Sequence, residues 1–356
     1  MNDNKGYLDI HILQTLPPSC VNRDDTGSPK TATYGGVTRA RVSSQSWKRA
    51  VRTMFRELLE PEKIGLRTKH LPEELARKIQ ELSPDCDAKK LAAEVLKAAK
   101  VGIKEKDFET DALFFVSTTQ IEKLAESAVR GEKDKEELQK VLKENPSVDL
   151  ALFGRMVASD PSLNYDAAAQ VAHSISTHEI HIEYDYFTAV DDCSPKDNAG
   201  AGHLGTVEYD SSTLYRYATV NLGEMADLLK EDAPEAVRCF VEAFIRSMPT
   251  GRQNTFANRT YPDFVYITVR NDQPVNLCGA FEKPVKAGKE GYVEPSENAL
   301  AKYAEKVYRS FAGEPEFSCA VGEAPAFKDM VQSYNLKDAL MIIENKLKDM
   351  LKDEVE

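Results

Sequence analysis

The sequence predicts an α+β sheet protein, and three observations support this fold class. Segments in which apolar residues alternate with a period of two, typical of strands, recur along the chain. Segments with a 3.6-residue apolar period, typical of amphipathic helices, separate them. Two long alternating segments, 179–190 and 206–222, flank a polar, glycine-rich stretch and predict a long β-hairpin.

The N-terminal part predicts a strand, a loop, a second strand and a helix. Residues 7–16 alternate, with Leu8, Ile10 and Ile12 on one face. Residues 22–36 are rich in turn formers and predict a loop, and 37–43 alternate again. A helix capped by one of the next serines follows. Its expected buried stripe consists of Trp47, Ala50, Val51, Met54, Phe55, Leu58 and Leu59.

The remaining elements follow from the same two periods. About Leu59 to Ser147 is helical, charged and weakly apolar, and indicates a small helical insertion. The apolar run over 148–158 predicts a strand leading to a turn, and the alanine-rich 165–176 predicts a helix. Towards the C-terminus we expect an amphipathic helix over 234–248, a strand over 263–272 and a helix over 336–356.

Composition limits the class of protein. The 356 residues carry a formal net charge of −12, and 42% of them are hydrophobic, enough for an ordinary core. No apolar run reaches the length of a membrane span, and the N-terminus lacks the pattern of a signal peptide. Six scattered cysteines form no CxxC pair, which argues against a zinc ribbon or a redox motif. We therefore expect a cytoplasmic protein.

The positive charge is concentrated in one segment. From Thr26 to Arg56 there are seven Lys or Arg and no acid. Like charges at Lys48, Arg52 and Arg56 are four residues apart and would repel on a helix, so a compensating anion is expected. The helix N-terminus beside them offers free backbone N–H groups, a ready anion site. The segment favours contacts with a phosphate backbone; the alternative is a solvated helix face.

Two other patterns are weaker. Residues 200–205, "GAGHLG", match the dinucleotide pattern GxGxxG, but a strand follows where a helix is required, so a hairpin tip is the better interpretation. His178, His181, Glu183 and Asp185 include three side chains on one strand face, where a metal is conceivable. A solvated strand face is the better interpretation.

A pair of acids adjoins the cationic segment. Asp24 and Asp25 lie in the loop that precedes it. Paired carboxylates near a phosphate backbone can hold a metal and cleave that backbone. They can equally cap a turn or pair with a neighbouring arginine. No P-loop, GxSxG or Cys–His nucleophile signature accompanies them.

Several stretches then resemble a known family. They are "PSCVNRDD", "YGGVTRARVSSQSWKRA", "LALFGRM", "FTAVDD", "AGHLGTVEYDSSTLYRYATVNL", "GRQNTFA" and "AFEKPVK", in the same order as in that family. The family is the CasC-type backbone subunit of the type I-E CRISPR surveillance complex, Cascade. The resemblance implies an RRM-like (ferredoxin-like) palm from 1–58 and 148–356, with a β-hairpin thumb at about 187–215. It also implies a helical fingers insertion over 59–147, where the sequence match is weak.

The resemblance implies a non-catalytic subunit that binds crRNA in antiviral defence. Copies of the family, six in its backbone, stack into a helical filament that holds the guide spacer in segments. Each thumb displaces one base, and the other bases remain free to pair with target DNA. The implied partners are crRNA, target DNA, other copies and other Cascade subunits, with no membrane, cofactor or metal. Cleavage belongs to a recruited nuclease.

The resemblance also assigns site residues. A wedge near the displaced base is carried over to Met156, and thumb contacts to Phe187, Thr188 and Leu204. The "TGSPK" stretch at 26–30 departs from the family and leaves the path of this loop open. A second hypothesis is a metal-dependent ribonuclease of the type III kind that uses Asp24 or Asp25. The implied RNA-binding residues around the cationic segment are Arg23, Lys30, Arg41, Ser43, Gln45, Lys48, Arg49 and Arg52.

Overall fold

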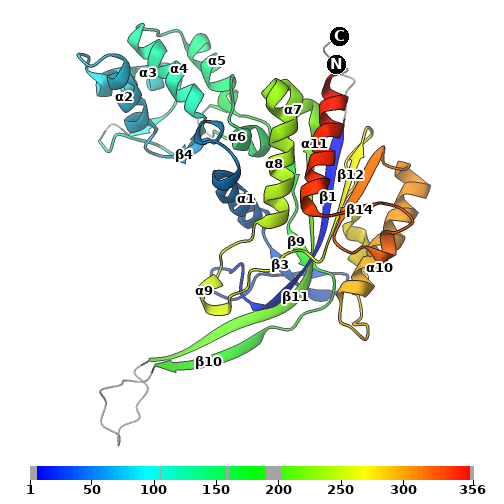
Figure 1. The fold of residues 1–356 in the computed structure, drawn as a ribbon. Coiled ribbons are helices and arrows are strands. Elements are labelled where there is room, and N and C mark those ends of the chain that lie inside the picture. The colour runs from blue at the N-terminus through cyan, green and yellow to red at the C-terminus, as the bar shows by residue number, and fades with distance from the viewer. Residues whose placement is uncertain (1–5, 105, 158–159, 190–202, 353–356) are drawn as a thin grey trace, which may run out of the picture.

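A large sheet forms the centre of the molecule, as the computed structural model shows for residues 6–104, 106–157, 160–189 and 203–352 (Figure 1). Helices α1, α7, α8 and α11 pack on one face and α10 on the other. A lobe of helices stands to one side, and the β10–β11 hairpin projects from the opposite end. The predicted α+β class is confirmed.

The sheet has the strand order β14-β13-β12-β1-β11-β9-β3-β2, and β8 and β10 also pair with β11. β1 lies between β11 and β12, antiparallel to both, with Ile10 opposite Ala218 and Ile267. The strands are β1 (Tyr7–Ser19), β2 (Thr31–Tyr34), β3 (Val37–Val42), β8 (Ala169–Val171), β9 (Ser174–Ser176), β10 (Glu183–Ala189), β11 (His203–Asn221), β12 (Phe264–Arg270), β13 (Phe317–Val321) and β14 (Ser333–Tyr334).

Both faces of β1 are buried, although the side chains alternate between apolar and polar. Leu8, Ile10 and Ile12 face the core beneath the first helical layer. Asp9 and His11 face the layer under α10 and are fully buried. Burial raises the pKa of Asp9 to about 6. The α-helices outside the segment 59–147 are α1 (Ser44–Leu58), α6 (Val148–Phe153), α7 (Leu222–Leu229), α8 (Ala233–Arg246), α9 (Gln253–Phe256), α10 (Val293–Val307) and α11 (Leu336–Lys352).

The segment between α1 and α6 forms a helical lobe with its own hydrophobic core. Leu75, Ile79, Leu96 and Leu124 are fully buried in that core, which explains the weak but periodic apolar pattern. We call residues 59–147 the helical lobe. Its elements are β4 (Leu66–Thr68), α2 (Leu71–Leu82), α3 (Ala88–Ala98), β5 (Ile103–Lys104), β6 (Glu109–Thr110), β7 (Phe114–Val116), α4 (Thr118–Val129) and α5 (Lys135–Lys143).

An ion pair joins α1 to both ends of the helical lobe. Asp149 at the start of α6 is fully buried, and its carboxylate accepts a hydrogen bond from Arg52 Nε at 2.9 Å. The other oxygen accepts from the Gly65 N–H and the Ser147 hydroxyl, both at 2.8 Å. The Arg52 guanidinium also lies 4.4 Å from the centre of the Phe115 ring. Of the α1 cations, Arg52 thus has its compensating anion in a side chain of this protein.

The predicted stripe of α1 is buried, and a buried arginine packs against it. Trp47 donates from Nε1 to Ser174 Oγ at 2.9 Å. The guanidinium of Arg216, on β11, lies 3.8 Å from the centre of the Trp47 rings. The same guanidinium donates to Gln14 Oε1 of β1 at 2.6 Å. This cluster fixes α1 against the central strands.

Three sequence predictions about secondary structure are wrong. The segment predicted as a strand over 148–158 begins with helix α6, because a short buried apolar run has no period that separates helix from strand. The segment predicted as a helix over 165–176 forms β8 and β9, because its small side chains pair with the long β11 edge. The predicted loop 22–36 contains β2, which pairs with β3.

We predict that Trp47→Ala lowers the free energy of unfolding by about 3–5 kcal/mol, because a large buried ring and its contact with Arg216 are lost. Urea denaturation measures the change. Ser174→Ala, which removes only the hydrogen bond to the indole, should cost about 1 kcal/mol. A Trp47→Ala protein of normal stability would show that the ring is not a core residue.

We predict that Arg52→Ala lowers the free energy of unfolding by about 3 kcal/mol, because Asp149 then remains buried without its ionic partner. Arg56→Ala is the matched control, since Arg56 is exposed on the same helix. Thermal and urea unfolding of both proteins check the difference. Equal stability of the two variants would contradict the proposed role of the ion pair.

Candidate nucleic-acid interface

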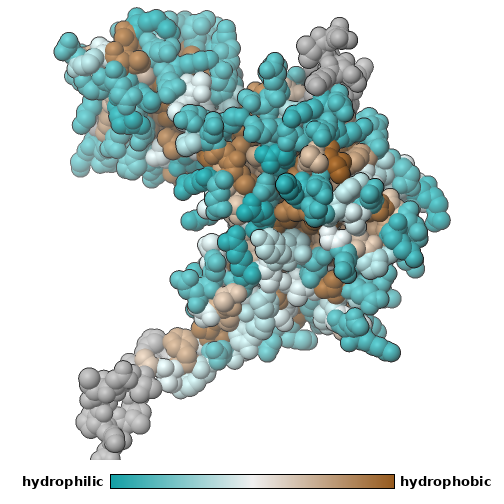
Figure 2. Space-filling model, in the orientation of Figure 1, coloured by the Kyte–Doolittle hydropathy of each residue, from teal (hydrophilic) through white to brown (hydrophobic). Residues whose placement is uncertain are grey.

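A cleft of about 880 Å³ lies between α1, the helical lobe and the turn after α6, and we call it the lobe cleft. Figure 2 shows the surface hollowed between the helical lobe and the hairpin. Five of the predicted RNA-binding residues line the lobe cleft, although one of them is more than 100 positions away in the sequence. They are Gln45, Lys48, Arg49, Arg52 and Met156.

The three cations that α1 contributes to the lobe cleft have different surroundings. Arg49 is exposed and forms no ion pair within the described part of the chain. Lys48 is half-buried, with its Nζ 5.6 Å from the centre of the Phe153 ring, and burial lowers its pKa. Arg52 is held by Asp149. Lys48 and Arg49 therefore offer uncompensated charge to an anion. Arg52 is already paired with Asp149, so any contact of Arg52 with RNA would add to that ion pair.

Met156 is held rigidly at the rim of the lobe cleft. Its side chain is 86% exposed, which is unusual for a large apolar residue. The preceding Arg155 is buried and donates to three carbonyl oxygens, those of Leu163 (3.0 Å), Phe115 (3.0 Å) and Leu142 (2.9 Å). Sequence reasoning missed Arg155. Its burial depends on carbonyl groups that are distant in the sequence, and the motif "GRM" contains no sign of them.

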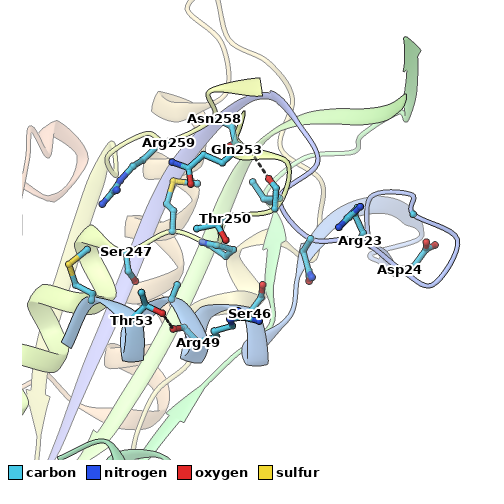
Figure 3. Close-up of a pocket in the computed structure, with 18 of the residues that line it drawn as sticks. Arg23, Asp24, Ser46, Arg49, Thr53, Ser247, Thr250, Gln253, Asn258 and Arg259 are labelled. Atoms are coloured by element: carbon cyan, nitrogen blue, oxygen red, sulfur yellow. Dashed lines mark hydrogen bonds between the residues drawn. The ribbon is translucent and has the colours of Figure 1, made fainter. Parts of the chain in front are cut away.

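A second cleft, of about 640 Å³, lies on the other side of α1, and we call it the loop cleft. Figure 3 shows polar side chains from α1, from the N-terminal loop and from the segment 247–259 around it. Arg49 lines both clefts, and Arg23 lies at the loop cleft. Further polar residues that sequence reasoning missed are Ser46, Thr53, Thr250, Gln253, Asn258 and Arg259.

The segment 247–259 contains the motif "GRQNTFA" and passes close to the N-terminal strand. A Cβ atom added to Gly251 would lie 2.1 Å from the carbonyl oxygen of Val21. Only glycine fits at this position, which explains why the motif begins with it. The motif gave a resemblance but no assigned role; the structure places it in the loop cleft.

Asp24 holds a turn in the N-terminal loop. Its Oδ1 accepts hydrogen bonds from the N–H and hydroxyl of Thr26, at 2.9 and 2.7 Å, and from the Ser28 N–H at 3.0 Å. The Thr26 hydroxyl is the main cause of the lowered pKa of Asp24. The loop closes through a β-bridge between Arg23 and Pro29, which gives the path that "TGSPK" left open. The turn-capping alternative therefore describes Asp24.

The predicted residues on β3 and at the α1 N-terminus divide into buried and exposed ones. Ser43 occupies the N-cap position but is buried, and its side chain makes no capping hydrogen bond. Arg39 is fully buried and donates to carbonyl oxygens, so it does not join Arg41 on the surface. Lys30 and Arg41 lie outside both large clefts, beside a small cavity at the base of the hairpin.

The hairpin places its predicted contacts on two faces. Thr188 pairs with Leu204, on the face that also carries the exposed Tyr184 and Tyr186. Phe187 is on the opposite face, above Gly205, where an added Cβ atom would lie 2.4 Å from its ring. The side chain of Leu204 lies outside the described residues. The residues 200–202 of "GAGHLG" also lie outside them.

The conceivable metal set does not assemble. His178 is buried, with Nδ1 donating to the Glu179 carbonyl (2.7 Å) and Nε2 accepting from the Thr213 N–H (3.1 Å). His181 is exposed instead. Among the residues that the structure describes, no three His, Cys, Asp or Glu are placed to hold a metal ion, and no helix is long and apolar enough to cross a membrane.

Comparison with known proteins gives consistent matches. The family model described as CT1975-like protein matches residues 8–347. A chain of the solved structure "CRISPR RNA-guided surveillance complex, pre-nicking" is 33% identical, with a TM-score of 0.79, over 97% of this chain and 100% of that one. A chain of another "CRISPR RNA-guided surveillance complex" is 30% identical, with a TM-score of 0.63, over 96% and 99%. No curated protein matches.

The family match spans most of the described chain, and both solved chains are covered almost completely. The chain therefore belongs to the CT1975-like protein family, which confirms its predicted kinship with the backbone subunit of Cascade.

Proposed function

We propose that the protein is a crRNA-binding backbone subunit of a CRISPR surveillance complex of the type I-E kind. The observation that carries the proposal is the lobe cleft, where Gln45, Lys48, Arg49 and the exposed Met156 face one space. The similarity to chains of two solved RNA-guided surveillance complexes supports it. The sheet would be the RRM-like palm, the helical lobe the fingers and the hairpin the thumb.

The cleft chemistry suits a nucleic-acid backbone. Lys48 and Arg49 supply charge for phosphates, and Gln45 lies in the first turn of α1, where unpaired N–H groups favour anions. Such contacts bind RNA without reading its sequence, as a guide with a variable spacer requires. Met156 would act as an apolar wedge that separates stacked bases, again without sequence preference.

Assembly follows from the same proposal. Copies stack along the crRNA into a filament, and the hairpin of one copy, with Phe187, Thr188 and Leu204, reaches over the RNA held by the next. The bases that are not displaced pair with target DNA. Other Cascade subunits bind the ends of the filament. The protrusion of β10 and β11 from the sheet supports a reach of this kind.

We propose further that the subunit is not an enzyme and works without cofactor or metal. The turn-holding hydrogen bonds of Asp24 favour this over the ribonuclease hypothesis. Incubation of the RNA-loaded protein with labelled target RNA and Mg²⁺ tests it. Regularly spaced cuts that disappear in Asp24→Ala or Asp25→Ala would establish the ribonuclease instead.

We predict that Lys48→Glu with Arg49→Glu weakens RNA binding about 100-fold at 0.15 M salt, because two attractive contacts become repulsive. Fluorescence anisotropy with a single-stranded RNA measures it. Lys302→Glu with Lys306→Glu, on the exposed side of α10, is the control with equal net charge and should bind normally. Equal losses in both variants would mean that only net charge matters.

We predict that Met156→Ala leaves RNA affinity within about threefold but blurs the periodic footprint of assembled complexes, since an exposed wedge contributes little to stability. Met156→Leu, which keeps the apolar bulk, should preserve the footprint. Nuclease protection of the guide measures both. An unchanged pattern in Met156→Ala would remove the wedge from the account.

A further inference from the structure

Lys30, Arg41 and His173 lie together on the surface at the base of the hairpin, outside both large clefts. We infer that they form a separate phosphate-binding site in which His173, on the connection between β8 and β9, contacts the RNA backbone. The inference rests on the proposed function, because RNA is the source of the phosphate. Neither motif resemblance nor charge pattern pointed to His173.

The hydrogen bond between Arg41 and His173 sets the direction of the imidazole. Arg41 Nη1 lies 3.3 Å from His173 Nδ1. A guanidinium can only donate, so Nδ1 accepts and the ring proton is on Nε2, the other edge of the ring. Arg41 Nε donates to the Thr31 carbonyl at 3.0 Å, which fixes the arginine against β2. An anion at this site could thus accept a hydrogen bond from His173 Nε2–H, next to the Arg41 guanidinium.

Lys30 adds the third donor. Its carbonyl oxygen accepts a hydrogen bond from the Arg41 N–H at 2.9 Å, so the two residues are direct neighbours. Partial burial and the charges of Arg41 and Lys30 all lower the pKa of His173, which shows that both cations are near the ring. Because Nδ1 accepts the hydrogen bond from Arg41, the ring that makes this contact is neutral and contributes a hydrogen bond rather than a charge.

No carboxylate of the described residues pairs with these donors. Neither Lys30 nor Arg41 forms an ion pair within the part of the chain that the structure describes. Asp210 lines the small cavity behind them, but it is buried, and burial alone raises its pKa to about 6. In a protein of net charge −12, a half-buried lysine and a half-buried arginine that lie side by side without an ion pair favour an external anion.

The test is RNA affinity of the full-length protein, measured by anisotropy with a single-stranded RNA. His173→Ala should weaken binding about tenfold or more, because one hydrogen bond to a charged group is lost. His173→Gln is the matched control: its amide can accept from Arg41 and donate outwards, so it should stay within about twofold of the wild type. Arg41→Ala should reduce the slope of log affinity against log salt by about 0.7.

Ethylation interference, in which single RNA phosphates are blocked, separates an RNA contact from a structural role. In complexes assembled on a guide RNA of one sequence, ethylation at a phosphate that recurs once per segment should interfere with binding to the wild type, and in His173→Ala this effect should disappear. Wild-type affinity of His173→Ala, or an unchanged interference pattern, would overturn the inference. The proposed function would still stand in that case if Lys48→Glu with Arg49→Glu weakens binding. Failure of the wild type to bind RNA would overturn the proposed function itself.

Discussion

The ion pair between Arg52 and Asp149 determines where the helical lobe stands relative to α1. Asp149 also accepts hydrogen bonds from Gly65 and Ser147, the points where the chain enters and leaves the lobe. One buried carboxylate therefore joins the cationic helix to both ends of the insertion. The lobe cleft lies next to this junction, between α1 and the helical lobe. The ion pair between Asp149 and Arg52 therefore helps to set the width of the cleft.

The structure divides the positive charge of the N-terminal segment into two kinds. Arg39 and Arg52 are used internally, one by carbonyl oxygens and one by Asp149. Lys48 and Arg49 are left without an anion and face the clefts. The hydrogen bonds of Arg39 and Arg52 hold the strands and helices around them in place. The same contacts fix the position of α1, which carries Lys48 and Arg49. An acidic protein can in this way present a local cationic surface without charge repulsion along α1.

Sequence periodicity predicted the helices that have one clear buried face, such as α1 and α8, and the alternation of β11. It failed at 148–158 and 165–176, where pairing and burial against distant strands decide the conformation. Residue chemistry predicted that the cationic segment binds an anion. The family resemblance assigned Gln45, Lys48, Arg49 and Met156, which the fold brings to the same cleft. Burial of Arg155 and the hydrogen bond from Arg41 to His173 depend on contacts over long sequence separations, which no local pattern encodes.

The central claim is that guide RNA passes through the lobe cleft. Photo-crosslinking of RNA that carries 4-thiouridine, followed by mass spectrometry of the crosslinked peptides, tests it most directly. The account predicts crosslinks to peptides that contain residues 44–52 and 155–167, which line the lobe cleft. Crosslinks confined to the outer helices of the helical lobe, with none to these peptides, would contradict it.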